Sequence, residues 1–209
     1  MKQSRFKFCA IDLFQNHRLQ STMLSGNLGH FLDKPLASLA KRMNVNPNVL
    51  TVAGFLFTSA AALTIPVNLF LGGILILVGG FFDMFDGIVA RVNNRTTKFG
   101  AFLDSVLDRY SDAFLFLGAA WYFYKGDSMT GVFLSLGTMT GALLTSYTRA
   151  RAEGLGKDCH VGLMERPERV VLLAFAALTG WVLPVMWILL VLTHVTVVQR
   201  IYHVWKGME

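Results

Sequence analysis

The chain has 209 residues, of which 54% are hydrophobic and only 15% are charged, and its mean hydropathy is +0.50. These values lie far from the averages of soluble domains, so the composition excludes an ordinary water-soluble protein and predicts a single membrane domain. The formal net charge of +6 would also suit a nucleic-acid-binding protein, and the positions of the basic residues decide between the two classes.

The start of the chain differs from the rest. Residues 1–26 are polar and basic with no sustained periodicity, and we expect them to form a cytoplasmic N-terminal arm before a membrane domain over residues 27–209. Between residues 28 and 43, apolar side chains recur every three or four positions with basic residues elsewhere on the turn. This pattern predicts an amphipathic helix at the membrane surface.

Three long segments contain no charged residue: 49–82, 128–148 and 170–199. About 20 apolar residues are enough for a helix to cross a bilayer, so the first and third segments are each long enough for two spans. Residues 103–124 supply another span that begins with a few charges. The sequence thus predicts an all-α integral membrane protein with six transmembrane helices. Breaks within the two long segments are expected at Pro66 with Asn68 and at Gly180 with Pro184.

The basic residues give the orientation of these spans. An even number of spans places both termini on one side, and all but two of the 19 Lys and Arg residues fall on that side, the exceptions being Arg109 and Lys125. The positive-inside rule assigns this side to the cytoplasm. We therefore expect a multi-pass protein of the cell membrane, inner or plasma, with both termini and the active site cytoplasmic and no nucleic-acid partner.

Four aspartates gather where the second and third spans meet. Asp83 and Asp86 are three residues apart near the end of the second span, and Asp104 and Asp108 are four apart near the start of the third. Each pair shares one face of its helix, and the short connection brings the two faces together. Carboxylates this close repel one another unless a cation neutralises them.

Divalent ions such as Mg²⁺ or Mn²⁺ take carboxylate ligands, and a pair of ions can clamp both oxygens of a phosphoryl transfer. The aspartates therefore predict phosphate chemistry. Gly87 and Gly100 leave room for a nucleotide or pyrophosphate, and Arg91 is placed to pair with phosphate oxygens. A cation transporter is the alternative, but it predicts broken helices and symmetric halves, which the sequence does not show.

Residues 83–108 fit the pattern D-x2-D-G-x2-A-R-x8-G-x3-D-x3-D at every fixed position. The segment resembles the CDP-alcohol phosphotransferases, and the likeness extends over roughly residues 34–206. It implies six transmembrane helices, a polar cavity open to the cytoplasm, a homodimer, and two metal ions, Mg²⁺ or Mn²⁺. A CDP-diacylglycerol-type lipid would be the donor.

The same resemblance implies roles for individual residues. Asp83, Asp86 and Asp104 would be metal ligands, while Asp108 would bind metal and also act as the general base. The CDP-lipid contacts would include Asp83 and the following residues: Asn46, Asn48, Thr51, Gly87, Arg91 and Thr97. A helix cap followed by a proline at the helix start is the alternative interpretation of the segment at 46–51.

An arginine-rich stretch follows the fourth span, in a segment expected to form a cytoplasmic loop over residues 149–169. Pairs at i, i+4 spacing, Arg149 with Glu153 and Glu165 with Arg169, would stiffen the helix ends. Guanidinium groups suit an acceptor that itself carries phosphate. The stretch resembles the branch that makes phosphatidylinositol phosphate from CDP-diacylglycerol and inositol phosphate. The candidate phosphate contacts are Arg149, Arg151, Arg166 and Arg169.

Phosphatidylglycerophosphate synthase, or another CDP-alcohol phosphatidyltransferase, is the alternative within the family, and a non-enzymatic membrane scaffold is an alternative outside it. Phosphatidylglycerophosphate synthase also has an anionic acceptor, glycerol 3-phosphate, and charge alone does not separate it from the inositol phosphate branch. A membrane scaffold that kept the fold without activity predicts the loss of at least one aspartate, whereas all four are present. Asp112, one turn after Asp108, either belongs to the polar network itself or contacts the residues that form it without binding the metal.

Overall fold

The computed structural model describes residues 40–41 and 45–208, and this part of the chain contains six helices and no strand. The predicted N-terminal arm lies outside the described residues, as does the predicted amphipathic helix apart from Ala40 and Lys41. The helices are α3 (Pro47–Thr64), α4 (Leu69–Val92), α5 (Lys98–Lys125), α6 (Met129–Gly154), α7 (Arg166–Thr179) and α8 (Val182–Lys206).

The helix boundaries follow from local chemistry. The side chains of Asn46, Asn68, Thr97 and Ser128 each accept a hydrogen bond from a backbone N–H in the first turn of the helix that follows. Such caps satisfy donors that have no partner inside the helix. At the end of α7, Gly180 adopts a left-handed conformation with φ of 79°. Both predicted breaks are therefore confirmed.

Among the described residues, four helices are long and apolar enough to cross a membrane: α3, α4, α6 and α8. Large apolar side chains are exposed along them, including Leu56, Phe70, Phe133 and Val191. Exposed apolar surface of this extent suits lipid contact rather than water. The other two helices differ for physical reasons, since α5 carries several charged residues in its first half and α7 has only 14 residues.

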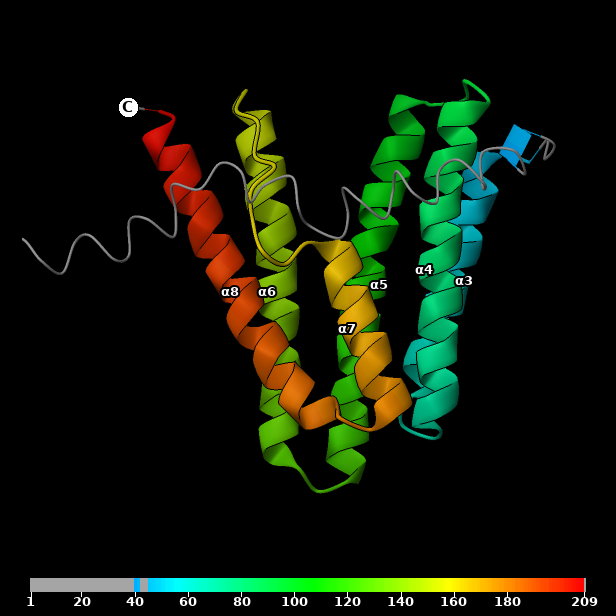
Figure 1. Cartoon of the computed structure of the whole chain (residues 1–209), viewed down its shortest axis with the longest axis vertical. Helices are drawn as coiled ribbons and strands as arrows, with labels where there is room; N and C mark the ends of the chain where they lie inside the picture. Colours follow the sequence, from blue (N-terminus) through cyan, green and yellow to red (C-terminus); the bar gives the residue numbers. More distant parts are fainter. Residues whose placement is uncertain (1–39, 42–44, 209) are drawn as a thin grey trace, which may run out of the picture.

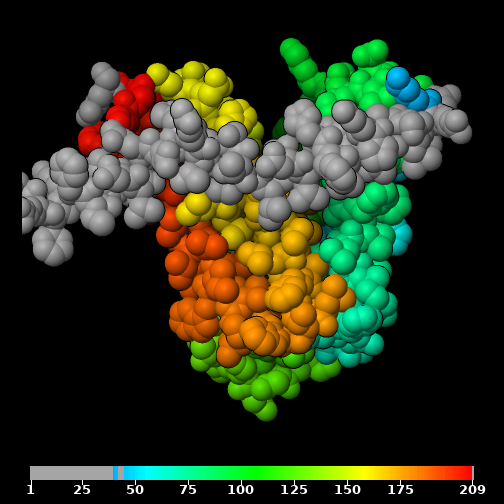
Figure 2. All heavy atoms as spheres, viewed as in Figure 1, coloured from blue at the N-terminus to red at the C-terminus, as the bar shows by residue number. Residues whose placement is uncertain are grey.

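The helices form two groups (Figure 1): the first consists of α3, α4 and α5, and the second of α6 and α8. Helix α3 packs against α4 and α5, and α6 packs against α8. Contacts between α5 and α6 join the groups, and α7 connects them a second time through contacts with α4 and α8. Figure 2 shows a notch between the groups at the end of the molecule where α6 ends and α5 begins.

Small residues allow the closest contacts within the first group. A Cβ atom added at Gly118 on α5 would lie 2.4 Å from the carbonyl oxygen of Ala62 on α3. One added at Gly79 on α4 would lie 2.3 Å from the hydroxyl oxygen of Thr58. Such contacts bring helix backbones together in membranes, where burial of apolar surface contributes little. They hold α4 and α5 on the same helix, α3, and so set the positions of the aspartates.

One sequence expectation about the fold was wrong. The segment 149–169 is not a loop throughout, because α6 continues to Gly154 and α7 begins at Arg166. Arg149 and Arg151 therefore lie on a helix, and the connecting segment spans residues 155–165 only.

Candidate metal and phosphate site

Three of the four predicted aspartates form a cluster. Asp83 on α4 and Asp104 and Asp108 on α5 each offer a carboxylate oxygen, and these oxygens lie within 4.8 Å of one another. All three side chains are partly buried. The i, i+4 spacing of Asp104 and Asp108 places both on the face of α5 that meets Asp83, as the sequence predicted.

Asp86 lies beside this group rather than within it. Its side chain is 6% exposed, it is close to the Thr51 hydroxyl, and its Oδ2 atom has no hydrogen-bond partner. Leaving a buried carboxylate oxygen without a partner costs free energy. A nearby cation would remove that cost.

These residues fit a divalent metal site. The donor set consists of carboxylate oxygens, which Mg²⁺ and Mn²⁺ prefer, and it includes the unpartnered oxygen of Asp86. Carboxylates this close also repel one another, and a bound cation lowers the free energy of that arrangement.

Arg166, the first residue of α7, reaches into the cluster. Its Nη1 atom forms a short ion pair with Asp83 Oδ2 and lies 2.9 Å from Asp108 Oδ1. Its Nε atom is 3.9 Å from Asp112 Oδ1 and is buried without a hydrogen-bond partner. The structure thus brings one of the four predicted phosphate contacts directly to the predicted metal ligands.

Arg169, one turn further along α7, has a different environment. It is 2% exposed, and its Nη2 atom donates to Asp112 Oδ2 at 2.6 Å. The predicted pairing of Arg169 with Glu165 is wrong: Glu165 instead lies 3.6 Å from Arg200 Nη2. The helical spacing allows the predicted pair, but the buried carboxylate of Asp112 is the stronger partner because little water competes for it.

The remaining two predicted arginines lie near the end of α6. Arg149 donates to Glu153 at 2.9 Å, as predicted, and its Nη2 atom lies 3.0 Å from His160 Nδ1. Arg151 is exposed. The four arginines therefore do not form one cluster in the described residues, since Arg166 and Arg169 contact the aspartates of α5 and Arg149 contacts the segment after α6.

Arg200 was missed by the sequence analysis. It is 3% exposed and donates to the carbonyl oxygens of Val161 and Thr145, and so holds the 155–165 segment against α6 and α8. A signal was available, because Arg200 is the first charged residue after the long apolar segment 170–199. A charged side chain within an apolar membrane helix needs hydrogen-bond partners inside the protein.

Some of the predicted nucleotide contacts cap helices, and others lie beside the two motif glycines. Asn46 and Thr97 are helix caps, as the alternative interpretation held for Asn46. A Cβ atom added at Gly100 would lie 2.9 Å from Thr97 Oγ1 and 3.0 Å from Asn48 Oδ1, so the starts of α3 and α5 converge there. One added at Gly87 would lie 3.2 Å from Arg91 Nη1. Both motif glycines therefore lie next to polar side chains.

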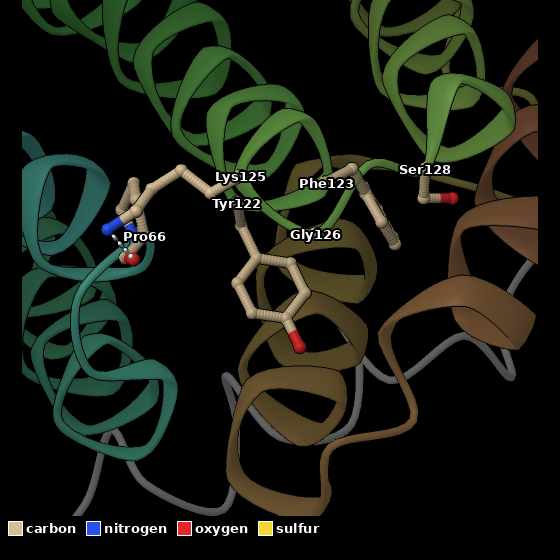
Figure 3. A pocket seen from close by; sticks show the side chains of 6 residues that line it. All are labelled: Pro66, Tyr122, Phe123, Lys125, Gly126 and Ser128. Atoms are coloured by element: carbon tan, nitrogen blue, oxygen red, sulfur yellow. Dashed lines mark hydrogen bonds between the residues drawn. The ribbon is translucent and has the colours of Figure 1, made fainter.

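A separate pocket lies at the other end of the bundle (Figure 3). Its volume is about 370 Å³, and its lining residues include Pro66, Tyr122 and Lys125, whose Nζ atom donates to the Pro66 carbonyl oxygen at 3.0 Å. Lys125 follows Asp108 by 17 residues of helix, which corresponds to about 25 Å. The pocket has no carboxylate among its lining residues and is remote from the aspartate cluster.

Comparison with known proteins identifies the family of this chain. Residues 44–199 match the family model described as CDP-alcohol phosphatidyltransferase. An archaetidylinositol phosphate synthase of Methanothermobacter thermautotrophicus is 35% identical over 178 residues, covering 82% of this chain and 89% of the relative.

Solved structures give the same result. The crystal structure of Mycobacterium tuberculosis phosphatidylinositol phosphate synthase with CDP-DAG bound has a TM-score of 0.71 and 33% sequence identity, covering 83% of this chain and 93% of that one. The same enzyme in complex with manganese and citrate has a TM-score of 0.69 and 32% identity, with 83% and 88% covered. The family model covers the aspartate cluster, the relatives match over most of both chains, and the chain therefore belongs to the CDP-alcohol phosphatidyltransferase family.

Proposed function

We propose that this protein transfers the phosphatidyl group of a CDP-diacylglycerol-type lipid to inositol phosphate, with release of CMP. The observation that carries the proposal is the meeting of Arg166 with Asp83 and Asp108. An acceptor that carries its own phosphate needs a cationic side chain beside the metal ligands, whereas an uncharged alcohol does not. The archaetidylinositol phosphate and phosphatidylinositol phosphate synthases among the relatives support the same acceptor.

Asp83, Asp86, Asp104 and Asp108 would hold two divalent ions, Mg²⁺ or Mn²⁺. When bound, such ions polarise the transferring phosphoryl group and neutralise charge on the departing CMP. The relative solved with manganese supports a divalent ion, and the unpartnered Oδ2 atom of Asp86 supports a cation beside the cluster of three.

Asp108 would act as the general base. It accepts the proton of the acceptor hydroxyl as that oxygen forms a bond to the lipid-bearing phosphorus, and the bond from this phosphorus to the CMP oxygen breaks. A base must lie within hydrogen-bond reach of the proton that it removes. Arg166 lies 2.9 Å from Asp108, so a phosphate bound by Arg166 brings the rest of the acceptor close to this carboxylate.

The donor nucleotide would lie between the starts of α3 and α5. Asn48, Thr97 and Gly100 converge there, and Gly87 leaves the side of α4 open next to Arg91. Thr51 lies one turn after Asn48 and next to Asp86. A nucleotide in this position has its phosphates near the aspartates and its lipid chains toward the apolar surface of the helices.

The remaining features of the proposal concern the membrane. Helices α5 and α7 would cross it together with the four apolar helices, which gives six spans. Both termini and the aspartate cluster would face the cytoplasm, in a homodimer of the cell membrane. The distribution of Lys and Arg supports this orientation.

The direct test is CMP release by purified protein in detergent. We expect turnover with CDP-diacylglycerol, Mg²⁺ and inositol 1-phosphate, and its loss when the metal is removed with EDTA. Free inositol, serine and glycerol 3-phosphate serve as comparison acceptors. Turnover with glycerol 3-phosphate alone would agree with the proposed mechanism but show that inositol phosphate is not the acceptor. Turnover that survives EDTA would show that the aspartates do not act by binding metal.

A further inference from the structure

Arg166 occupies the place where a metal ion would bind. Its Nη1 atom contacts Asp83 Oδ2 and Asp108 Oδ1 together, and these are oxygens of two residues from the three-aspartate group. Mg²⁺ needs oxygen ligands at about 2.0–2.1 Å. The guanidinium group and an ion bound to the same two oxygens would overlap and repel each other, so only one of them can be present there.

A second position for Arg166 lies close by. Asp112 Oδ1 is 3.9 Å from Arg166 Nε, which is buried and has no hydrogen-bond partner. The other oxygen of Asp112 is held by Arg169 at 2.6 Å, and this contact fixes the position of the whole carboxylate. A shift of about 1 Å would bring Nε within hydrogen-bond distance of it. A metal ion on Asp83 and Asp108 would repel the guanidinium group toward the Asp112 carboxylate, and its Nη groups could then bind an anion.

From these contacts we infer that Arg166 is a built-in counterion that exchanges with the metal. Without metal it neutralises Asp83 and Asp108. When metal binds there, Arg166 moves onto Asp112 and presents its Nη groups to the phosphate of the acceptor. The second half of this inference rests on the proposed function, because it takes the acceptor to be a phosphorylated alcohol.

The exchange couples two binding events. Metal binding must displace Arg166, and a phosphate that holds Arg166 in the displaced position therefore strengthens metal binding. Thermodynamic linkage makes the effect reciprocal, so metal strengthens phosphate binding by the same factor. The enzyme would thus bind its acceptor well only when its metal site is filled.

The test measures Mn²⁺ binding directly, by the EPR signal of free Mn²⁺ in titrations of detergent-purified protein without donor lipid. We expect Arg166→Gln to bind Mn²⁺ about tenfold more tightly than the wild type, within the usual range of coupling between sites. Arg109→Gln is the matched control, because Arg109 also carries a positive charge near the cluster, 3.9 Å from Asp108, but within the described residues it forms no ion pair that bridges two of its aspartates. Its Mn²⁺ affinity should change much less. Arg166→Lys keeps the charge and should stay near the wild type.

Inositol 1-phosphate is then added to the same titrations. It should raise the Mn²⁺ affinity of the wild-type protein severalfold and have no effect on Arg166→Gln. Equal Mn²⁺ affinity of the wild type and Arg166→Gln, or an equal increase in Arg109→Gln, would overturn the exchange. If Arg166→Gln binds Mn²⁺ more tightly but inositol 1-phosphate has no effect on the wild type, the exchange holds and the failure lies in the proposed acceptor. Should Arg166→Gln be too unstable for the EPR titration, its thermal unfolding midpoint with and without Mn²⁺ decides the first point. The exchange predicts a larger upward shift with Mn²⁺ than the wild type shows, and an equal shift overturns it.

Discussion

Arg169 of α7 and Asp112 of α5 form a buried ion pair in which the Nη2 and Oδ2 atoms are 2.6 Å apart. Their side chains are only 3% and 5% exposed. The pair joins two helices that lie far apart in the sequence, and it fixes the carboxylate that faces Arg166 Nε. It thereby links the position of α7 to the aspartate cluster.

This pair predicts a stability effect. Asp112→Asn leaves the Arg169 charge buried without its partner, and removing one member of a buried pair typically costs about 3–5 kcal/mol. We expect a clearly lower thermal unfolding midpoint in detergent, measured by intrinsic fluorescence. Asp127→Asn, in the exposed turn between α5 and α6, is the control and should unfold like the wild type. An unchanged midpoint for Asp112→Asn would show that the pair contributes little.

The base assignment predicts a catalytic effect. Asp108→Asn removes the proposed proton acceptor, which is also a proposed metal ligand, but keeps the size of the side chain, so we expect CMP release to fall by at least about 10²–10⁴-fold. Binding of CDP-diacylglycerol should persist, because the proposed nucleotide contacts lie on other residues. Asp158→Asn, in the exposed segment after α6, should retain wild-type turnover. Turnover by Asp108→Asn near that of the wild type would refute its role as base.

The close contact between α3 and α5 predicts a packing effect. Gly118→Ala would place its Cβ atom 2.4 Å from the Ala62 carbonyl oxygen, which is backbone and cannot turn aside. Overpacking of this kind typically costs about 1–3 kcal/mol, and we expect a lower unfolding midpoint. Gly154→Ala is the control, because a Cβ atom there meets nothing within 4 Å. Equal midpoints for the two variants would show that the helices separate without cost.

The burial of Cys159, in the segment between α6 and α7, predicts how the stability of the protein and the reactivity of this thiol depend on pH. It is a free cysteine with 0% exposure, and burial raises the pKa of its thiol above the ordinary value, although Arg200 and Arg149 act in the opposite direction. Since the raised pKa belongs to the folded state, the stabilisation from the neutral thiol is present below the unfolded pKa and is lost as the pH rises through the folded pKa.

The measurement is alkylation by iodoacetamide in a Cys9→Ser background, because the thiolate is the reactive form. The rate should be well below that of free cysteine at pH 8 and should rise steeply only at more alkaline pH. Addition of denaturant serves as the control and should restore the rate of a free thiol. Reaction of the folded protein at the free-thiol rate would contradict the burial of Cys159.

The sequence by itself determined the local features of this protein. Apolar segments located the helices, and the breaks at Asn68 and Gly180 followed from capping and left-handed backbone geometry. The spacing of Asp104 and Asp108 placed both on one face of α5, because helical periodicity is a property of the chain alone. The i, i+4 pair of Arg149 and Glu153 was predictable for the same reason.

Only the tertiary structure decided which charged groups meet across helices. Glu165 and Arg169 have the spacing of a helical pair, yet Glu165 contacts Arg200 and Arg169 contacts Asp112. Likewise, Arg166 reaches Asp83, which lies 83 positions earlier in the chain. In a low-dielectric interior, buried charges take the partner that is nearest in space and best shielded from water. Sequence spacing cannot supply that partner, because it depends on how α7 packs against α4 and α5.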